Sequence, residues 1–151
     1  MLNPSCTFFG DSDTPKNMMM LLSRAISNLI ILEKVDMFYV GNQGAFDSMV
    51  QKTLKGVTDC FSPDVVYGII LANGGKEELS NLDEKDFRHA LLPAELDGLS
   101  PEEAIERRNL IMIDWSNIVV TYVSNPTGYA AKYKEIAEKA GKKIIDVLDF
   151  K

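Results

Sequence analysis

The feature that most constrains the fold is a regular alternation of two kinds of segment. Short apolar runs, rich in aromatic and β-branched residues, alternate with longer segments whose apolar residues recur every three or four positions. The apolar runs are 6–9, 35–40, 65–71, 117–123 and 142–147, and the helical segments are 14–33, 44–57, 100–114 and 130–141. This alternation predicts an α/β fold, in which right-handed crossovers place helices on both faces of a five-stranded parallel sheet.

Local signals predict where the helices begin and where the chain loops. Thr14 followed by Pro15 predicts a hydroxyl N-cap with proline at the first helical position, and Ser100-Pro101-Glu102-Glu103 is a capping box. Phe61-Ser62-Pro63-Asp64 predicts a break before the third strand. The polar stretch 73–99 predicts a long loop over the strand ends, with one short turn of helix.

Composition limits the class of protein. A chain of 151 residues, 46% of them hydrophobic, predicts one domain over 1–151. A net charge of -6 disfavours binding to nucleic acid or to an anionic membrane. Two distant cysteines and one histidine predict neither a disulfide framework nor a metal site, and no cofactor is expected. No signal peptide and no apolar stretch of membrane-spanning length is seen, so a cytoplasmic protein is expected.

Small or polar loops follow three of the predicted strands and lead into helix N-termini. They are Gly10-Asp11-Ser12, Gly41-Asn42-Gln43-Gly44, and Ser124-Asn125-Pro126-Thr127-Gly128. Ligands of open α/β sheets bind at the carboxyl ends of the strands, and free N–H groups there favour anions. Each loop alone is also explained by the need of the chain to turn, and none matches G-x-G-x-x-G or the P-loop.

Charged and polar residues interrupt the apolar stripe of the helix over 100–114. Arg108 and Asn109 lie in the middle of this stripe, whereas Arg107 lies on a neighbouring face. A buried guanidinium needs an anion or several acceptors, which predicts either a ligand phosphate or an acid such as Asp11, Asp13 or Asp47 as its partner. Asp47 itself fits a helix-dipole role or a contact with a ribose or base, and Thr121 lies close to a strand end.

Several of these stretches together resemble the YpsA-like branch of the SLOG superfamily, which groups DprA with the LOG cytokinin-activating enzymes. The stretches are Thr7-Phe8-Phe9-Gly10, the run from Phe38 through Gly41-Asn42-Gln43-Gly44 to Asp47, Arg107-Arg108-Asn109, and Thr121-Tyr122-Val123 with Gly128. The resemblance implies a three-layer Rossmann-like fold with strand order 3-2-1-4-5. It also implies nucleotide-derived ligands and a homodimer.

Two departures bear on catalysis. Relatives often have a histidine where this chain has Asp11, and Lys134 stands where the LOG enzymes have a glutamate, with Glu135 one place out of register. A shift of one residue turns a helical side chain by about 100°. Hydrolysis of an N-glycosidic bond needs a carboxylate near the ribose. The resemblance therefore supports binding without carrying over the reaction.

The leading hypothesis is that the protein binds or senses a nucleotide-derived, phosphate-bearing small molecule, with catalytic residues unknown. The alternative is a nucleotide or N-glycoside hydrolase resembling the phosphoribohydrolases, with Asp11 or Asp47 as the carboxylate and Arg108 as the phosphate clamp. A third hypothesis, a DNA-associated protein like DprA, is disfavoured by the net charge.

Overall fold

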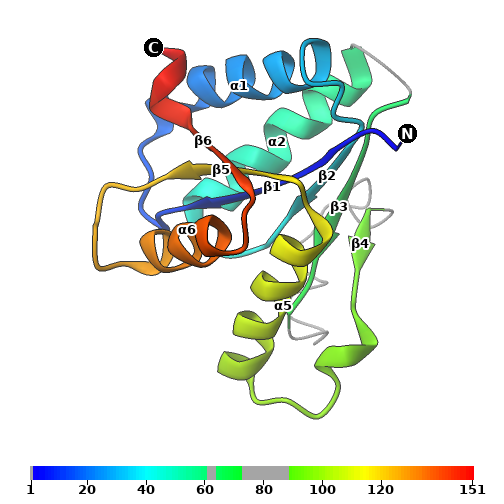
Figure 1. Cartoon of the computed structure of the whole chain (residues 1–151), viewed down its shortest axis with the longest axis vertical. Helices are drawn as coiled ribbons and strands as arrows, with labels where there is room; N and C mark the ends of the chain where they lie inside the picture. The colour runs from blue at the N-terminus through cyan, green and yellow to red at the C-terminus, as the bar shows by residue number, and fades with distance from the viewer. Residues whose placement is uncertain (1, 61–63, 73–88) are drawn as a thin grey trace.

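The sheet is parallel throughout and has six strands in the order β4-β3-β2-β1-β5-β6 (Figure 1). A computed structural model describes residues 2–60, 64–72 and 89–151. The strands are β1 Ser5–Gly10, β2 Met37–Val40, β3 Val66–Ile70, β4 Ala90–Leu91, β5 Ile118–Tyr122 and β6 Lys143–Asp146. The five predicted strands and their order 3-2-1-4-5 are confirmed. The two-residue β4 adds an unforeseen sixth strand beside β3, because two residues are too few to show a periodicity.

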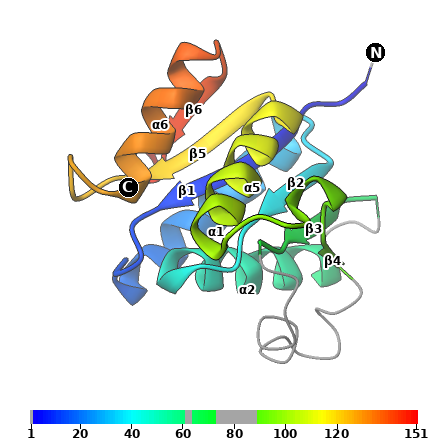
Figure 2. The same cartoon turned by 90° about the horizontal axis from the view of Figure 1, so that it is seen from below.

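Helices cover both faces of the sheet, as Figure 2 shows. The α-helices are α1 Met19–Ile31, α2 Gly44–Cys60, α5 Pro101–Trp115 and α6 Tyr129–Lys139, and the 3-10 turns are η1 Lys16–Met18, η2 Ala94–Leu96 and η3 Val147–Phe150. α1 and α2 lie on one face together with η3, and α5 and α6 lie on the other. The chain therefore has the three layers and the doubly wound arrangement that the alternation predicts.

Alternate residues of each strand enter two different cores. Phe8 of β1 packs under α1 and α2 with the fully buried Phe38, whereas Phe9 packs under α5 and α6 and stacks on Tyr133 at 5.2 Å. Burying each such side chain contributes about 1.5–3 kcal/mol. Cys6 is fully buried on the α1/α2 side, and this burial raises the pKa of its thiol. Both faces of the central strands are apolar, which is typical of a parallel sheet.

One predicted helix start is confirmed and one is wrong. Ser100 caps α5 and accepts a hydrogen bond from the Glu103 N–H at 3.3 Å. Thr14 caps nothing, because its hydroxyl donates to the Asp11 carbonyl and closes a turn after β1. The first helical turn then begins at Lys16 with Pro15 outside it, and α1 proper begins only at Met19.

The long polar stretch before α5 lies partly outside the described residues. Positions 73–88 and the first three residues of the predicted break, 61–63, are among the residues that the structure does not describe. The described remainder holds β4 and the 3-10 turn η2, which is the short turn of helix expected there. Among the described residues no helix is long and apolar enough to cross a membrane.

Candidate functional site

The three polar loops meet at the carboxyl edge of the sheet, and the first of them contacts both others. Asp11 Oδ2 accepts hydrogen bonds from Ser124 N at 2.6 Å, from Ser124 Oγ at 2.7 Å and from Asn125 N at 3.1 Å. On the other side, the Ser12 carbonyl accepts a hydrogen bond from Ala45 N at 2.9 Å. The 5% exposed Asp11 therefore fixes the spacing of the loops.

Close packing explains several glycines of these loops. Gly44 has φ +83°, and a Cβ there would lie 2.7 Å from the Ser12 Cβ. A Cβ on Gly10 would lie 2.2 Å from ring carbons of Phe46. Gly128, the N-cap residue of α6, packs on the Asn125 side chain. These glycines allow neighbouring segments of the chain to pack closely. This agrees with the interpretation that the loops contain glycine because the chain must turn there.

Gly41 has a different surrounding, because a carboxylate and a guanidinium converge on it. A Cβ at Gly41 would lie 2.9 Å from Asp47 Oδ2 and 3.1 Å from both Cζ and Nη1 of Arg108. Asp47 comes from the first turn of α2 and is 4% exposed, and Arg108 comes from the middle of α5 and is 0% exposed. The absence of a side chain at Gly41 leaves the space in which these two charged groups approach the end of β2.

Neutral partners hold the Arg108 guanidinium. Its Nε donates to Asn109 Oδ1 at 2.7 Å and its Nη1 donates to the Ile70 carbonyl at the end of β3 at 3.0 Å. Its Nη2 is buried and has no hydrogen-bond partner among the described residues. Asn109 Nδ2 in turn donates to the Tyr129 hydroxyl at 3.0 Å, which connects α5 to the first residue of α6. The predicted burial of Arg108 and Asn109 is confirmed.

Burial dominates the electrostatics of this cluster. It raises the pKa of Asp47 from its ordinary 3.8 to about 6, and the Arg108 guanidinium and the hydrogen bond from Gln43 N at 2.8 Å oppose the rise. Burial also raises the pKa of Tyr129 to about 12, to which the Asp47 charge adds. Asp47 and Arg108 make no direct ion pair within the described part of the chain. Asp47 is therefore the titratable carboxylate of the cluster.

The remaining predicted residues lie around this cluster or away from it. Asn42 and Gln43 are half-buried in the loop before α2, and Thr121 is buried in β5. The Thr121 Oγ1 is the second buried side-chain atom without a partner among the described residues. Arg107 is exposed and lies on the outer side of α5.

Sequence reasoning missed two residues that contact the cluster, Gln51 and Tyr129. Gln51 Nε2 donates to the Gly41 carbonyl at 2.8 Å and to Asn42 Oδ1 at 3.2 Å. Its spacing of four residues from Asp47 on the same helix was an available signal, because such residues share a face. Tyr129 is half-buried through its contacts with Asn109 and Phe9.

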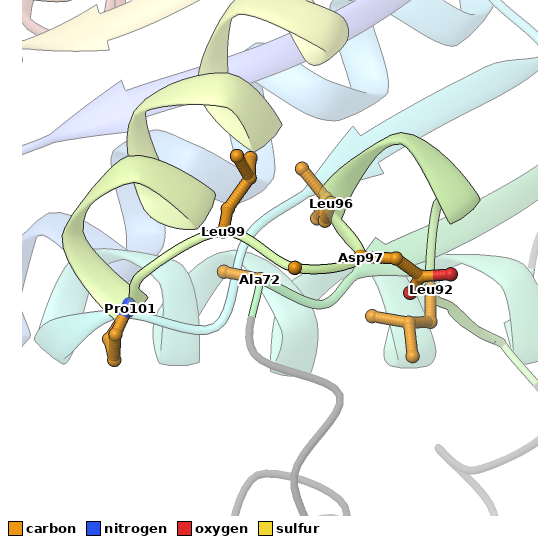
Figure 3. Close-up of a pocket in the computed structure, with 7 residues that line it drawn as sticks. Ala72, Leu92, Leu96, Asp97, Leu99 and Pro101 are labelled. Atoms are coloured by element: carbon orange, nitrogen blue, oxygen red, sulfur yellow. The ribbon is translucent and has the colours of Figure 1, made fainter.

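Two hollows with described linings lie beside α5. The larger one, with a volume of about 270 Å³, lies between η2 and the start of α5 (Figure 3); its lining is Ala72, Leu92, Leu96, Asp97, Gly98, Leu99 and Pro101. The smaller one, about 160 Å³, is lined by Leu99 and by residues of the α5 outer face that include Arg107. Gly41 and Arg108 line neither hollow. No group of three His, Cys, Asp or Glu side chains suited to a metal occurs in 2–60, 64–72 and 89–151.

A parallel sheet with helices on both faces, polar loops at its carboxyl edge and a buried arginine beside them defines a Rossmann-like α/β protein. Comparison with solved structures found DNA processing protein A (DprA) from Streptococcus pneumoniae, with a TM-score of 0.71 and 14% sequence identity. The match covers 95% of this chain and 50% of DprA, so the chain spans about half the length of that protein. Comparisons with protein-family models and with curated proteins found no match.

The match to DprA agrees, at the level of the fold, with the resemblance to the SLOG superfamily. The assignment to its YpsA-like branch stays a prediction. At this identity the likeness defines the chain path and the sheet, while ligand and reaction have to be argued from the residues of this chain.

Proposed function

We propose that the carboxyl edge of the sheet binds a nucleotide-derived small molecule through a phosphate group that contacts Arg108. The observation that carries the proposal is the guanidinium of Arg108, which is 0% exposed and has an unpartnered Nη2 in the described part of the chain. Buried polar atoms without partners are rare in folded proteins, and a missing ligand or ion is one of the few explanations for them. Arginine is also the side chain best suited to a phosphate.

The start of α6, which the Tyr129 side chain connects to the Arg108 cluster, supplies a second group of donors. Gly128 at its N-cap makes no side-chain cap, so the first N–H groups of this 11-residue helix are available to an anion. At α2, by contrast, Ala45 N already donates to the Ser12 carbonyl. Tyr129, the first residue of α6, accepts a hydrogen bond from the neighbour of Arg108, so this helix end belongs to the Arg108 cluster.

A hydrolase acting on a nucleotide or N-glycoside is the second candidate, and one observation favours a particular carboxylate for it. Asp11 Oδ2 accepts three hydrogen bonds from the loop after β5, which assigns this residue to the scaffold. Asp47 is buried beside Arg108 with a pKa of about 6, in the range where a carboxyl group works as a general acid or base. The hydrolase would therefore use Asp47.

A thermal-shift titration with AMP, ADP-ribose, cyclic dinucleotides and inorganic phosphate tests the binding. A ligand at 100 times its dissociation constant adds about 2.7 kcal/mol of stability. We expect Arg108→Ala to abolish this gain, and we expect Arg24→Ala, which removes an exposed arginine on the opposite layer, to keep it. Free base among the products would favour the hydrolase.

Circular dichroism and the melting temperature establish first that Arg108→Ala is folded. Should it not fold, Arg108→Lys keeps the charge but loses the two-pronged geometry, and its affinity should fall at least tenfold. Absence of any gain in the unchanged protein across the whole panel would refute the proposed function.

Two further proposals follow from the expected class. The net charge of -6 predicts no retention on DNA at low salt, and retention would favour a DNA-associated role instead. The expected homodimer predicts a sedimenting mass of twice that of one chain, which analytical ultracentrifugation measures.

A further inference from the structure

Asp47 and Arg108 converge on Gly41, and the Nη2 of Arg108 has no hydrogen-bond partner among the described residues. Because Asp47 Oδ2 and the Arg108 guanidinium both lie within about 3 Å of one point above Gly41, they are at most about 6 Å apart. Asp47 Oδ2 accepts from Gln43 N, and Arg108 donates to the Ile70 carbonyl and to Asn109. Each charged group therefore has the other as its nearby opposite charge.

An anion that binds Arg108 Nη2 changes this balance. It introduces a second negative charge into a space that already holds one carboxylate and one cation. Two anions competing for one cation in a buried site cannot both stay ionised without a large energetic penalty. The carboxylate is the group able to relieve the conflict, because it can take up a proton whereas the guanidinium stays charged at all relevant pH values.

We propose that the site binds its anion together with one proton, which Asp47 takes up. The inference rests on the proposed function and adds to it the regulation of the site: ligand affinity falls as the pH rises through the range in which Asp47 loses its proton. The ligand class that follows is a fully ionised anion, such as a phosphate monoester in its dianionic form. Its charge then replaces the charge that Asp47 gives up.

The groups that face Asp47 from the surrounding elements support this assignment. From α5 the facing group is the Arg108 guanidinium, which lowers the pKa of Asp47. From α6 the facing group is the neutral Tyr129 hydroxyl. From the loop after β2 the Gln43 N–H donates to the carboxylate. The Asp11 carboxylate in the loop after β1 is committed to Ser124 and Asn125. Within the described residues, Asp47 is thus the group whose protonation changes when an anion binds Arg108.

The direction of the effect follows from linkage. Burial places the pKa of the unliganded Asp47 at about 6, and an anion on Arg108 removes the stabilisation that the cation gives to the carboxylate. The pKa of Asp47 is therefore higher in the complex than in the free protein. Between these two values each unit of pH increase weakens binding by up to about tenfold, because one proton must be taken up.

Isothermal titration calorimetry with sulfate tests the proposal, because sulfate keeps its full charge across the relevant range. We expect roughly tenfold weaker binding at about pH 7.5 than at about pH 5.5. Titrations in two buffers of different ionisation enthalpy should show up to one proton taken up. Asp47→Asn should bind sulfate with nearly the same affinity at both values, whereas Asp59→Asn, which removes an exposed carboxylate from the same helix, should keep the pH dependence.

The outcomes separate this inference from the proposed function. AMP serves as a second probe, and since its own phosphate titrates near pH 6 with either protein, the difference between the unchanged protein and Asp47→Asn carries the result. Binding without proton uptake, or with an equal pH dependence in Asp47→Asn, overturns the inference and leaves the proposed function standing. Binding of neither probe overturns the inference, and absence of any gain across the whole thermal-shift panel overturns the proposed function as well. Should Asp47→Asn not fold, the proton count of the unchanged protein decides alone.

Discussion

Gly41→Ala is the substitution that most directly tests the described site. The new methyl group would lie 2.9 Å from Asp47 Oδ2 and 3.1 Å from Arg108 Cζ, both shorter than ordinary contacts. Neither neighbour can withdraw freely, because Gln43 N holds the carboxylate and the Ile70 carbonyl holds the guanidinium. Overpacking of this kind costs about 1–3 kcal/mol, and losing one of the hydrogen bonds adds about 0.5–1.5 kcal/mol.

Urea denaturation followed by circular dichroism measures the effect. A loss of about 2–3 kcal/mol lowers the urea midpoint by roughly 1 M for a protein of this size, with the slope unchanged. Gly56→Ala is the matched control, because Gly56 lies inside α2 with nothing within 4 Å of an added Cβ. That variant should gain about 0.5–1 kcal/mol from the higher helix propensity of alanine. A Gly41→Ala protein as stable as the unchanged one would refute the convergence of charges on Gly41.

Three further predictions concern the buried polar residues. Thr121→Val replaces a buried hydroxyl, which has no partner among the described residues, by a methyl group. We expect a gain of about 1 kcal/mol in the free energy of unfolding, measured by urea titration; a loss would mean that the hydroxyl has a partner. Asp11→Ala removes the acceptor of three hydrogen bonds from Ser124 and Asn125, and should lose about 2–4 kcal/mol in the same assay, against little change for the exposed Asp13→Ala. Because the folded pKa of Asp47 lies above its ordinary value, folding takes up a proton between about pH 4 and pH 6. The stability conferred by this group is therefore present below pH 4 and is lost as the pH rises to 6. Urea denaturation at several pH values in this window should show a smaller fall in the free energy of unfolding for Asp47→Asn than for the unchanged protein. An equal fall for both proteins would contradict the raised pKa.

The sequence predicted the parts of the fold that depend on local periodicity. Five strands, the alternating helices and the Ser100 cap follow from patterns within a few residues, and the structure confirms them. The predicted N-cap at Thr14 was wrong because Thr-Pro also fits a turn. Here the Thr14 hydroxyl donates to the Asp11 carbonyl three residues earlier. The edge strand β4 was missed because it pairs through its backbone with β3 over only two residues.

The sequence predicted which residues belong to the candidate site but not which of them contact one another. Arg108 and Asn109 stood out because they interrupt an apolar stripe, and their burial is a local property of α5. Which acid would accompany Arg108 depends on contacts between distant segments, and the sequence left Asp11, Asp13 and Asp47 open. Asp11 contacts Ser124 and Asn125, which lie 113 and 114 positions further along the chain, and no local pattern encodes such a pairing.

The difference between Asp11 and Asp47 supports the proposal that Asp47 belongs to the binding site and Asp11 to the scaffold. Both are nearly buried at the carboxyl edge of the same sheet. Asp11 accepts hydrogen bonds from three donors of one loop through its Oδ2, so the fold itself supplies its partners. Asp47 has one backbone donor and a guanidinium that it does not contact directly, so its charge is held at an energetic cost. Among the described residues Arg108 Nη2 has no hydrogen-bond partner in the same cluster, which agrees with the proposal that a ligand completes the site.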